Sequence, residues 1–337
     1  MTPDPSEGDR QGVSIPSLDE IQGPVAARLD LVMDELRRIV TSDFNRIEEV
    51  NDYLALLRGK LFRPALLLLS NEIGEGTDDR AVTLAAVVEL VHLATLVHDD
   101  AVDHSVLRRG QPTVNAMWTH QVAIIMGDYL YSRAIMQLAE VGLMDAVDVM
   151  ANAANEMSVG EMRQLTAYDA LAFTEDDYTR LIAAKTASLM KAACELGALV
   201  GASEFREPLS RYGHCLGMAF QVVDDILDYT VSEEEAGKPT GHDLREHKVT
   251  LPLVGAMRRS GEADNAVVRR VFDDPEPSDE AIEDVVSWVH ESGGVAYAQA
   301  QADRYAATAA AALSEVPRGP ATDALHAAIA YATRRTR

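Results

Sequence analysis

Two clusters of aspartates carry the clearest chemical signal in this sequence of 337 residues. Asp-Asp pairs occur five times, but only two pairs have a third Asp four positions after the first. These clusters are Asp99-Asp100-Ala-Val-Asp103 and Asp224-Asp225-Ile-Leu-Asp228. On a helix, residues four apart share one face and the second residue lies beside them. Each cluster is therefore predicted to present its carboxylates in one direction.

Both clusters end strongly apolar runs, HLATLVH before Asp99 and CLGMAFQVV before Asp224. Crowded carboxylates at the edge of a core repel one another and lose hydration, so they require cations. Hard oxygen ligands of this kind suit Mg²⁺, which keeps several waters and bridges to substrate phosphates. A solvated acidic helix end is the alternative for either cluster alone. The matched pair favours a metal site that surrounds one diphosphate.

Basic residues alternate with these clusters, although the chain has only 30 Lys and Arg against 54 Asp and Glu. They are Lys60, Arg63, Arg108, Arg109, Lys185, Lys238 and Lys248. A lone Lys in an apolar helix, as at 185, is costly unless it faces a polar cavity. We interpret the set as a divided phosphate site, in which metal ions bind one diphosphate and Arg and Lys bind another. His92 lies seven residues before Asp99, where it could donate to a phosphate, whereas His98 fits a core or boundary position.

Helical periodicity runs through nearly the whole chain, which predicts an all-α protein. The expected helices lie near 18–42, 44–57, 62–73, 80–103, 113–141, 144–168, 175–201, 205–230, 249–259, 264–273, 278–291, 294–313 and 320–335. No strand-like alternation and no interdomain linker stand out. We therefore expect a mobile polar tail at 1–17 and a single helical domain over 18–337.

The net charge of −24 argues against a nucleic-acid binder. The apolar stretches around 81–98 and 181–201 contain His, Glu or Lys, so they fit helices with one buried face and no transmembrane segment is expected. The polar start does not resemble a signal peptide. Cys194 and Cys215 are isolated, which predicts reduced core thiols in a cytoplasmic protein.

Over about residues 20–335, the sequence resembles the trans-isoprenyl diphosphate synthases, or polyprenyl synthetases. The matching blocks are GKLFRP (59–64), ELVHLATLVHDDAVDHSVLRRGQPT (89–113), GDYLYSRA (127–134), GEMRQL (160–165), KTASL (185–189), FQVVDDILDY (220–229), GKPTGHDLREHKVTLP (237–252) and ESGGVAYA (291–298). The resemblance implies an isoprenoid-synthase-type antiparallel helical bundle around a deep central cavity, usually as a homodimer.

The resemblance also implies roles for these positions. Three Mg²⁺ ions would be held by Asp99, Asp100, Asp103, Asp224, Asp225 and Asp228. The diphosphate of an allylic substrate would be bound by these ions with Arg108, Lys185, Lys238 and Lys248. Isopentenyl diphosphate would be bound by Lys60, Arg63, His92 and Arg109. Thr186 and Gln221 would line the reaction zone. The chain departs from the common pattern at Arg58 and at His247, where Gly is usual, and a bulky His247 adjoins Lys248.

The implied activity is a Mg²⁺-dependent prenyl transfer that condenses isopentenyl diphosphate with an allylic diphosphate, 1'-4 head to tail. The growing chain would pass Thr95, one turn before Asp99, then Val91 and Ala94. These side chains are small, which resembles enzymes that make hexaprenyl to decaprenyl chains, with a deeper stop at Tyr131, Ala134 or Ile135.

Other interpretations stay open at this point. A geranylgeranyl or farnesyl diphosphate synthase would differ only in the depth of the tube. A terpene cyclase shares the fold, but its second metal motif normally mixes Asn, Ser and Glu. A non-catalytic subunit of a heteromeric synthase would tend to lose the Asp clusters, and a structural acidic protein would need none of them.

Overall fold

The computed structural model describes residues 15–56, 59–74, 76, 78–108, 110–165, 170–231, 240–259 and 266–334. Its helices are α1 (Leu18–Gln22), η1 (Gly23–Val25), α2 (Ala26–Val40), α3 (Asn45–Leu56), α4 (Phe62–Asn71), α5 (Arg80–Val102), α6 (Val114–Met117), α7 (His120–Val141), α8 (Met144–Leu165), α9 (Glu175–Ile182), η2 (Ala183–Ala187), α10 (Ser188–Gly201), η3 (Ser203–Phe205), α11 (Arg206–Thr230), α13 (His242–Arg245), α14 (Leu251–Met257), α15 (Ala266–Phe272), α16 (Asp279–Glu291), α17 (Gly294–Leu313) and α18 (Pro320–Arg334). A short antiparallel hairpin pairs β1 (Leu107–Arg108) with β2 (Gln111–Pro112). The all-α prediction is confirmed.

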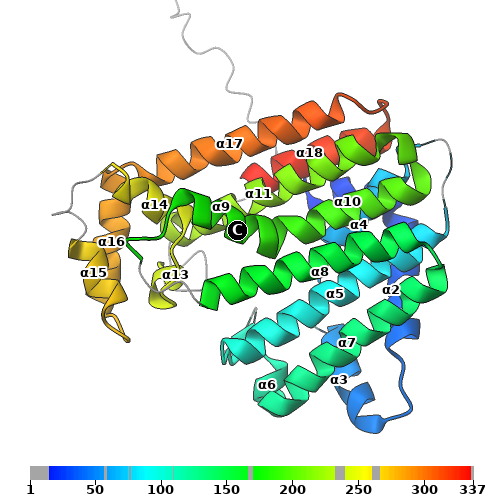
Figure 1. Cartoon of the computed structure of the whole chain (residues 1–337), viewed down its shortest axis with the longest axis horizontal. Coiled ribbons are helices and arrows are strands. Elements are labelled where there is room, and N and C mark those ends of the chain that lie inside the picture. Colours follow the sequence, from blue (N-terminus) through cyan, green and yellow to red (C-terminus); the bar gives the residue numbers. More distant parts are fainter. Residues whose placement is uncertain are drawn as a thin grey trace, which may run out of the picture.

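The long helices lie alongside one another and alternate in direction along the chain (Figure 1). Helix α5 packs against α7, α4, α2 and α10, and α11 packs against α17 and α10. Because α5, α8 and α11 run the same way, their carboxyl ends lie at one end of the bundle (Figure 1). Helices α13 to α16 lie at that same end (Figure 1). This arrangement brings the two Asp clusters, 125 positions apart in sequence by their first members, to the same place.

Helix α5 forms the centre of the largest hydrophobic core. Within the described ranges it alone is long and apolar enough to cross a membrane by length and composition, with a hydropathy of 1.8. Its apolar residues are instead packed between neighbouring helices, where Leu84, Val88 and Leu90 are fully buried. Burial of one such side chain stabilises the fold by roughly 1.5–3 kcal/mol. Both cysteines are buried and free, as predicted for core thiols.

Several local details differ from the sequence prediction. The helix expected over 113–141 is broken at Trp118, because Thr119 begins a new helix by accepting the N–H of Val122 at 3.2 Å. The hairpin at 107–112 was not expected, since two-residue strands carry no measurable alternation. Helix α13 is also new. The predicted mobile tail falls mostly on residues 1–14, which lie outside the described residues, and Ser17 caps α1.

Candidate active site

A cavity of about 1040 Å³ opens at the end of the bundle where α5 and α11 finish. Its walls come from these two ends, from α8, α9 and η2, from the segment after α13, and from α15. Its acidic residues are Asp99, Asp103, Asp224, Asp225, Asp243, Glu246 and Asp273. Its Lys and Arg residues are Arg108, Lys185, Lys248 and Arg269. Both predicted Asp clusters therefore contribute to one cavity.

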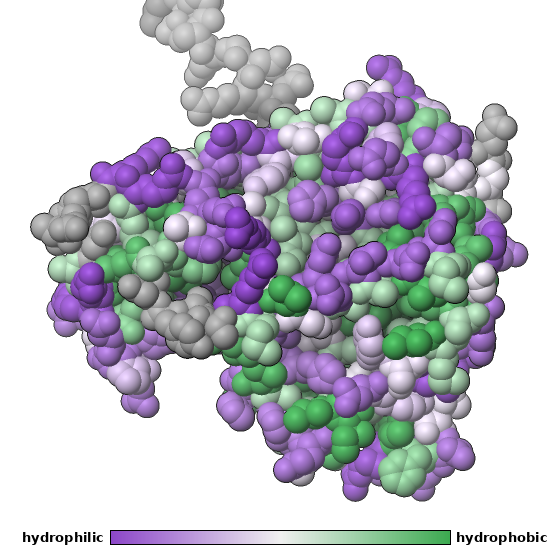
Figure 2. Space-filling model, in the orientation of Figure 1, coloured by the Kyte–Doolittle hydropathy of each residue, from purple (hydrophilic) through white to green (hydrophobic). Residues whose placement is uncertain are grey.

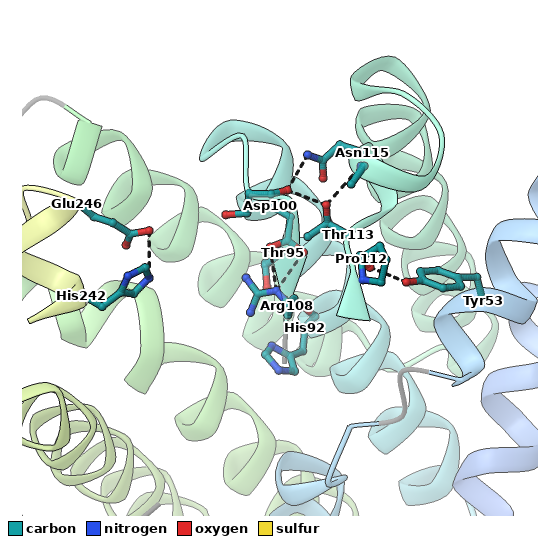
Figure 3. Close-up of polar contacts among 12 residues, drawn as sticks. Tyr53, His92, Thr95, Asp100, Arg108, Pro112, Thr113, Asn115, His242 and Glu246 are labelled. Carbon is teal, nitrogen blue, oxygen red and sulfur yellow. Dashed lines mark hydrogen bonds and ion pairs between the residues drawn. The ribbon is translucent and has the colours of Figure 1, made fainter. Parts of the chain in front are cut away.

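The first cluster divides its carboxylates between the cavity and the protein. Asp99 and Asp103 line the cavity, whereas Asp100 is buried. The Nε of Arg108 donates to both carboxylate oxygens of Asp100, at 2.8 and 3.0 Å. In Figure 3, Arg108 and Asp100 lie near the middle of the view, and His242 and Glu246 lie at its left. The guanidinium thus holds the end of α5 while it also lines the cavity.

The turn after α5 sets the position of Arg108. Arg108 ends β1 and pairs with Gln111 of β2 in the hairpin. The turn is fixed at the carbonyl of Ser105, which accepts from Thr113 Oγ1 at 2.6 Å and from Asn115 Nδ2 at 2.9 Å. Tyr53 of α3 donates to the carbonyl of Pro112 at 2.5 Å (Figure 3). Several elements therefore hold this one cation in place.

The second cluster is tied into a chain of side-chain hydrogen bonds. Asp225 is buried and accepts from Tyr178 Oη at 2.5 Å and from Gln221 Nε2 at 2.8 Å. The amide oxygen of Gln221 in turn accepts from Thr186 Oγ1 at 2.8 Å. Thr186 and Gln221, which were predicted to line the reaction zone, both line the cavity. The network fixes the rotamers of these four side chains toward one another.

Asp224 is exposed on the cavity wall, and Asp228 has a separate structural task. The Asp228 carboxylate accepts the backbone N–H groups of His242 and Asp243, at 3.1 and 3.0 Å. It therefore binds the amino end of α13 and brings the segment that follows onto the cavity. Asp228 does not line the cavity itself, and its role as a metal ligand stays a prediction.

Lys185 reaches the cavity from η2, which is a turn of π-helix. Such turns insert an extra residue and are frequent at functional sites. The turn has little space: a Cβ at Gly217 would lie 2.6 Å from Ala187 Cα, and one at Gly160 would lie 2.9 Å from Ala184 Cβ. Lys185 Nζ lies 2.6 Å from Glu161 Oε2 and donates to Gln164 Oε1 at 3.0 Å. The predicted polar cavity around this Lys is present.

Lys248 also lines the cavity, and its Nζ donates to Glu246 Oε2 at 2.5 Å. Its backbone N–H donates to the carbonyl of Asp243 at 2.8 Å. The preceding residue, His247, has a left-handed backbone with φ of 55°. The bulky His247 therefore takes the conformation that Gly would adopt freely, and Lys248 stays on the wall.

The carboxylates carry more negative charge than the buried site can easily hold. Burial raises the pKa of Asp99 to about 6, against the opposing effect of Lys185. Burial, with Asp228 nearby, raises the pKa of Asp243 to about 7. Burial also holds the pKa of Asp225 well above its ordinary range. Added positive charge would relieve this repulsion, and carboxylate oxygens suit a hard divalent cation.

Within the described ranges, no three His, Cys, Asp or Glu side chains converge closely enough to enclose one ion. The carboxylates instead face the cavity from two sides. Mg²⁺ binds through one or two carboxylates plus water and phosphate oxygens. The site therefore fits ions that are shared between the protein and a phosphorylated ligand.

Three of the residues predicted to bind isopentenyl diphosphate, Lys60, Arg63 and His92, do not line this cavity. Lys60, just before α4, is exposed and its Nζ lies 3.4 Å from Tyr331 Oη. Arg63 is half-buried in the first turn of α4, and His92 is half-buried on α5 (Figure 3). Arg109 and Lys238 lie outside the described residues. The isopentenyl site stays a prediction.

The residues predicted to set product length lie on α5 before Asp99, and none of them lines the cavity. Val91 and Ala94 are buried, and Thr95 is half-buried with its Oγ1 donating to the carbonyl of His92 at 2.8 Å. Of the candidates for a deeper stop, Ala134 is buried, whereas Tyr131 and Ile135 are 36% and 50% exposed. Ala134 is thus the candidate that faces the interior of this chain.

Sequence reasoning missed Asp243, Tyr178 and Glu161 as parts of the site. Asp243 and Glu161 lie inside the matching blocks GKPTGHDLREHK and GEMRQL, so the signal was available. Tyr178 follows an acidic helix start, and nothing in its neighbours indicated that its hydroxyl would bond to Asp225, 47 residues away.

Comparison with known proteins relates this geometry to one family. Residues 44–289 match the family model described as polyprenyl synthetase. The chain is 37% identical over 308 residues to the geranyl-diphosphate-specific all-trans-nonaprenyl-diphosphate synthase of Rhodobacter capsulatus, covering 91% of this chain and 94% of that protein. It is 37% identical over 283 residues to heptaprenyl diphosphate synthase component 2 of Geobacillus stearothermophilus, covering 82% and 86%. Among solved structures, a polyprenyl synthase from Caulobacter crescentus CB15, complexed with calcium and isoprenyl diphosphate, matches with a TM-score of 0.89 and 33% identity over 96% of this chain and 99% of that one.

Proposed function

Because the chain belongs to the polyprenyl synthetase family and is an all-trans polyprenyl diphosphate synthase, we propose that it extends an allylic diphosphate with isopentenyl diphosphate to hexaprenyl to decaprenyl length, using Mg²⁺. One observation carries the proposal: both Asp clusters line one cavity together with Arg108, Lys185 and Lys248. Carboxylates bind metal ions and the three cations bind phosphate oxygens. The cavity therefore suits a diphosphate that arrives with its metal ions.

The reaction follows from where the charges lie. In the allylic substrate the bond between C1 and the diphosphate oxygen breaks, and the electron pair leaves with the diphosphate. Lys185, Arg108 and Lys248 donate to the oxygens on which this charge develops. Mg²⁺ held at Asp99, Asp103, Asp224 and Asp225 would supply further stabilisation of the leaving group. The double bond of isopentenyl diphosphate then attacks C1, and a proton is lost to the departed diphosphate.

The remaining wall protects the cationic stage. Phe173, Leu181 and Val249 line the cavity with apolar surface, which limits water that would trap the allylic cation. Thr186 and Gln221 hold each other by a hydrogen bond of 2.8 Å, so their oxygen dipoles have fixed positions. Preorganised dipoles stabilise developing charge without reorganisation at the moment of reaction.

Product length is the finer part of the proposal. Thr95 and Val91 lie about 6 and 12 Å along α5 from Asp99 at 1.5 Å per residue. The small Ala94 and Thr95 leave the path open to a long chain, and the name of the Rhodobacter capsulatus relative specifies nine prenyl units. Incubation with labelled isopentenyl diphosphate, farnesyl diphosphate and Mg²⁺, followed by sizing of the dephosphorylated products, tests this. Products that stop at geranylgeranyl length would contradict it.

A second candidate is a subunit that needs a partner chain, because one relative is named as component 2 of a synthase. We instead propose a homodimer. Apolar side chains are exposed on α7 and α8, including Ile125 at 63%, Met144 at 72% and Met162 at 62%. Figure 2 shows hydrophobic surface over these helices. Sedimentation of the purified chain should give a dimer that is active alone.

Removal of predicted metal ligands tests whether the Asp clusters are needed for activity. The double variant Asp99→Ala with Asp224→Ala removes one carboxylate from each cluster, and we expect it to lose turnover while it keeps the wild-type circular dichroism spectrum. Retained turnover would refute the assignment of the Asp clusters. Turnover that appears only when a second protein is added would support the heteromeric alternative.

A further inference from the structure

One cation on the cavity wall was absent from every predicted set. Arg269 of α15 lines the cavity with Arg108, Lys185 and Lys248. The other three are bound to carboxylates: Arg108 to Asp100 at 2.8 Å, Lys185 to Glu161 at 2.6 Å and Lys248 to Glu246 at 2.5 Å. In the part of the chain that the structure describes, the Arg269 side chain has no ion pair or hydrogen bond.

The packing of α15 determines where Arg269 points. Val268 and Val271 are fully buried in a cluster with Leu244 and Ile282, so this face of the short helix is fixed. The next residue, Arg270, points elsewhere and its Nη2 lies 2.7 Å from Asp284 of α16. Two adjacent arginines thus have different surroundings: one neutralises a surface carboxylate, and the other faces the cavity.

His247 also lines the cavity, and it contacts the end of α15. Its Nε2 lies 2.9 Å from the carbonyl oxygen of Asp274, two residues after the end of α15, and its ring packs edge-on against Phe272 at 5.7 Å. A left-handed backbone is unfavourable for a non-Gly residue, and φ at His247 is 55°. The contacts at the end of α15 offset this cost. His247 adjoins Lys248 in sequence, so one short segment both contacts the end of α15 and carries Lys248.

We propose that Arg269 contacts a diphosphate in the cavity and that His247 positions the Arg269 side chain, an inference that rests on the proposed function. At each of the other three cations a bound diphosphate would share the cation with a carboxylate, whereas Arg269 has no carboxylate partner among the described residues. Its planar guanidinium suits two phosphate oxygens at once. Arg269 also adds positive potential to the cavity, in a chain whose net charge is −24. The diphosphate is that of the allylic substrate or the inorganic diphosphate that is released.

The test compares Arg269→Gln with Arg270→Gln, which removes the same charge one residue away. Arg269→Gln should raise KM for farnesyl diphosphate, the inhibition constant of inorganic diphosphate, or both, by about three- to tenfold. Arg270→Gln should leave both constants within about twofold, since exposed charges have small effects. A rise in KM assigns the contact to the substrate, and a rise in the inhibition constant alone assigns it to the product. Equal effects of the two variants, or a change in KM for isopentenyl diphosphate alone, would overturn the proposal.

The role of His247 is tested by a double-mutant cycle. His247→Ala should raise the same constant as Arg269→Gln, and Arg269→Gln should have less than about a twofold further effect in the His247→Ala background. Fully additive effects would show that His247 does not position Arg269. Calorimetric titration of the same variants with Mg²⁺ and inorganic diphosphate tests the diphosphate contact separately from the proposed activity. If the wild type makes no polyprenyl product, the proposed function fails, yet tighter diphosphate binding by wild type than by Arg269→Gln would still support the contact.

Discussion

Substitution of Gly217 by Ala should damage the site without touching any charged residue. The new Cβ would lie 2.6 Å from Ala187 Cα and 3.0 Å from Ala187 Cβ. Ordinary contacts begin about 3.4 Å apart, so α11 and η2 must separate by roughly 0.5–1 Å. Overpacking of this kind costs about 1–3 kcal/mol in the free energy of unfolding. Because η2 carries Lys185 and Thr186, the shift also moves both side chains relative to Asp225.

Urea unfolding and steady-state kinetics measure these two effects separately. We expect Gly217→Ala to lower the urea midpoint and to reduce kcat with the allylic substrate at least tenfold, since small displacements of positioning groups have large kinetic effects. Gly23→Ala is the matched control, because a Cβ at Gly23 meets nothing within 4 Å. If Gly217→Ala matched Gly23→Ala in both stability and kcat, the close approach at η2 would have no functional meaning.

Two further results are expected. Thr95→Phe should shorten the product, because an aromatic ring one turn before Asp99 fills the path of the chain, and an unchanged product length by chromatography would contradict this path. In metal-free buffer, Asp243→Asn should stabilise the protein more at pH 8 than at pH 5, by on the order of 2 kcal/mol in urea unfolding. The folded-state pKa of Asp243 is raised to about 7, above the unfolded value. The folded chain therefore binds the extra proton and loses stability as pH rises from about 4 to 7, a loss that the neutral Asn avoids. A stabilisation independent of pH would refute this.

Helix positions followed closely from the sequence, because apolar periodicity over long segments is a local signal. The two-residue hairpin at 107–112 and the π-helical turn at Ala183–Ala187 were not predictable in the same way. The first is too short for a pattern, and the second depends on packing between α8 and α11 at glycines distant in sequence. Tertiary packing decides such details.

The sequence predicted which residues form the candidate site more fully than how their side chains are arranged. The spacing of the Asp clusters indicated carboxylates on one side of each helix, and Asp99 and Asp224 do line the cavity. Spacing could not indicate that Asp100 would turn toward Arg108, or that Asp228 would cap α13. Both depend on where a later loop returns. Asp243 was missed for the same reason, since its backbone N–H reaches the carboxylate of Asp228 only in the folded chain.

The ion pairs on the cavity wall have a consequence for which ligands can bind. Arg108, Lys185 and Lys248 are each held by a carboxylate, at 2.8, 2.6 and 2.5 Å. An anion that binds by itself adds negative charge beside Asp100, Glu161 and Glu246 and brings no cation to balance it. A magnesium salt of a diphosphate brings both signs and can satisfy cations and carboxylates together. The site should therefore discriminate against metal-free anions, and substrate and metal should each strengthen the binding of the other.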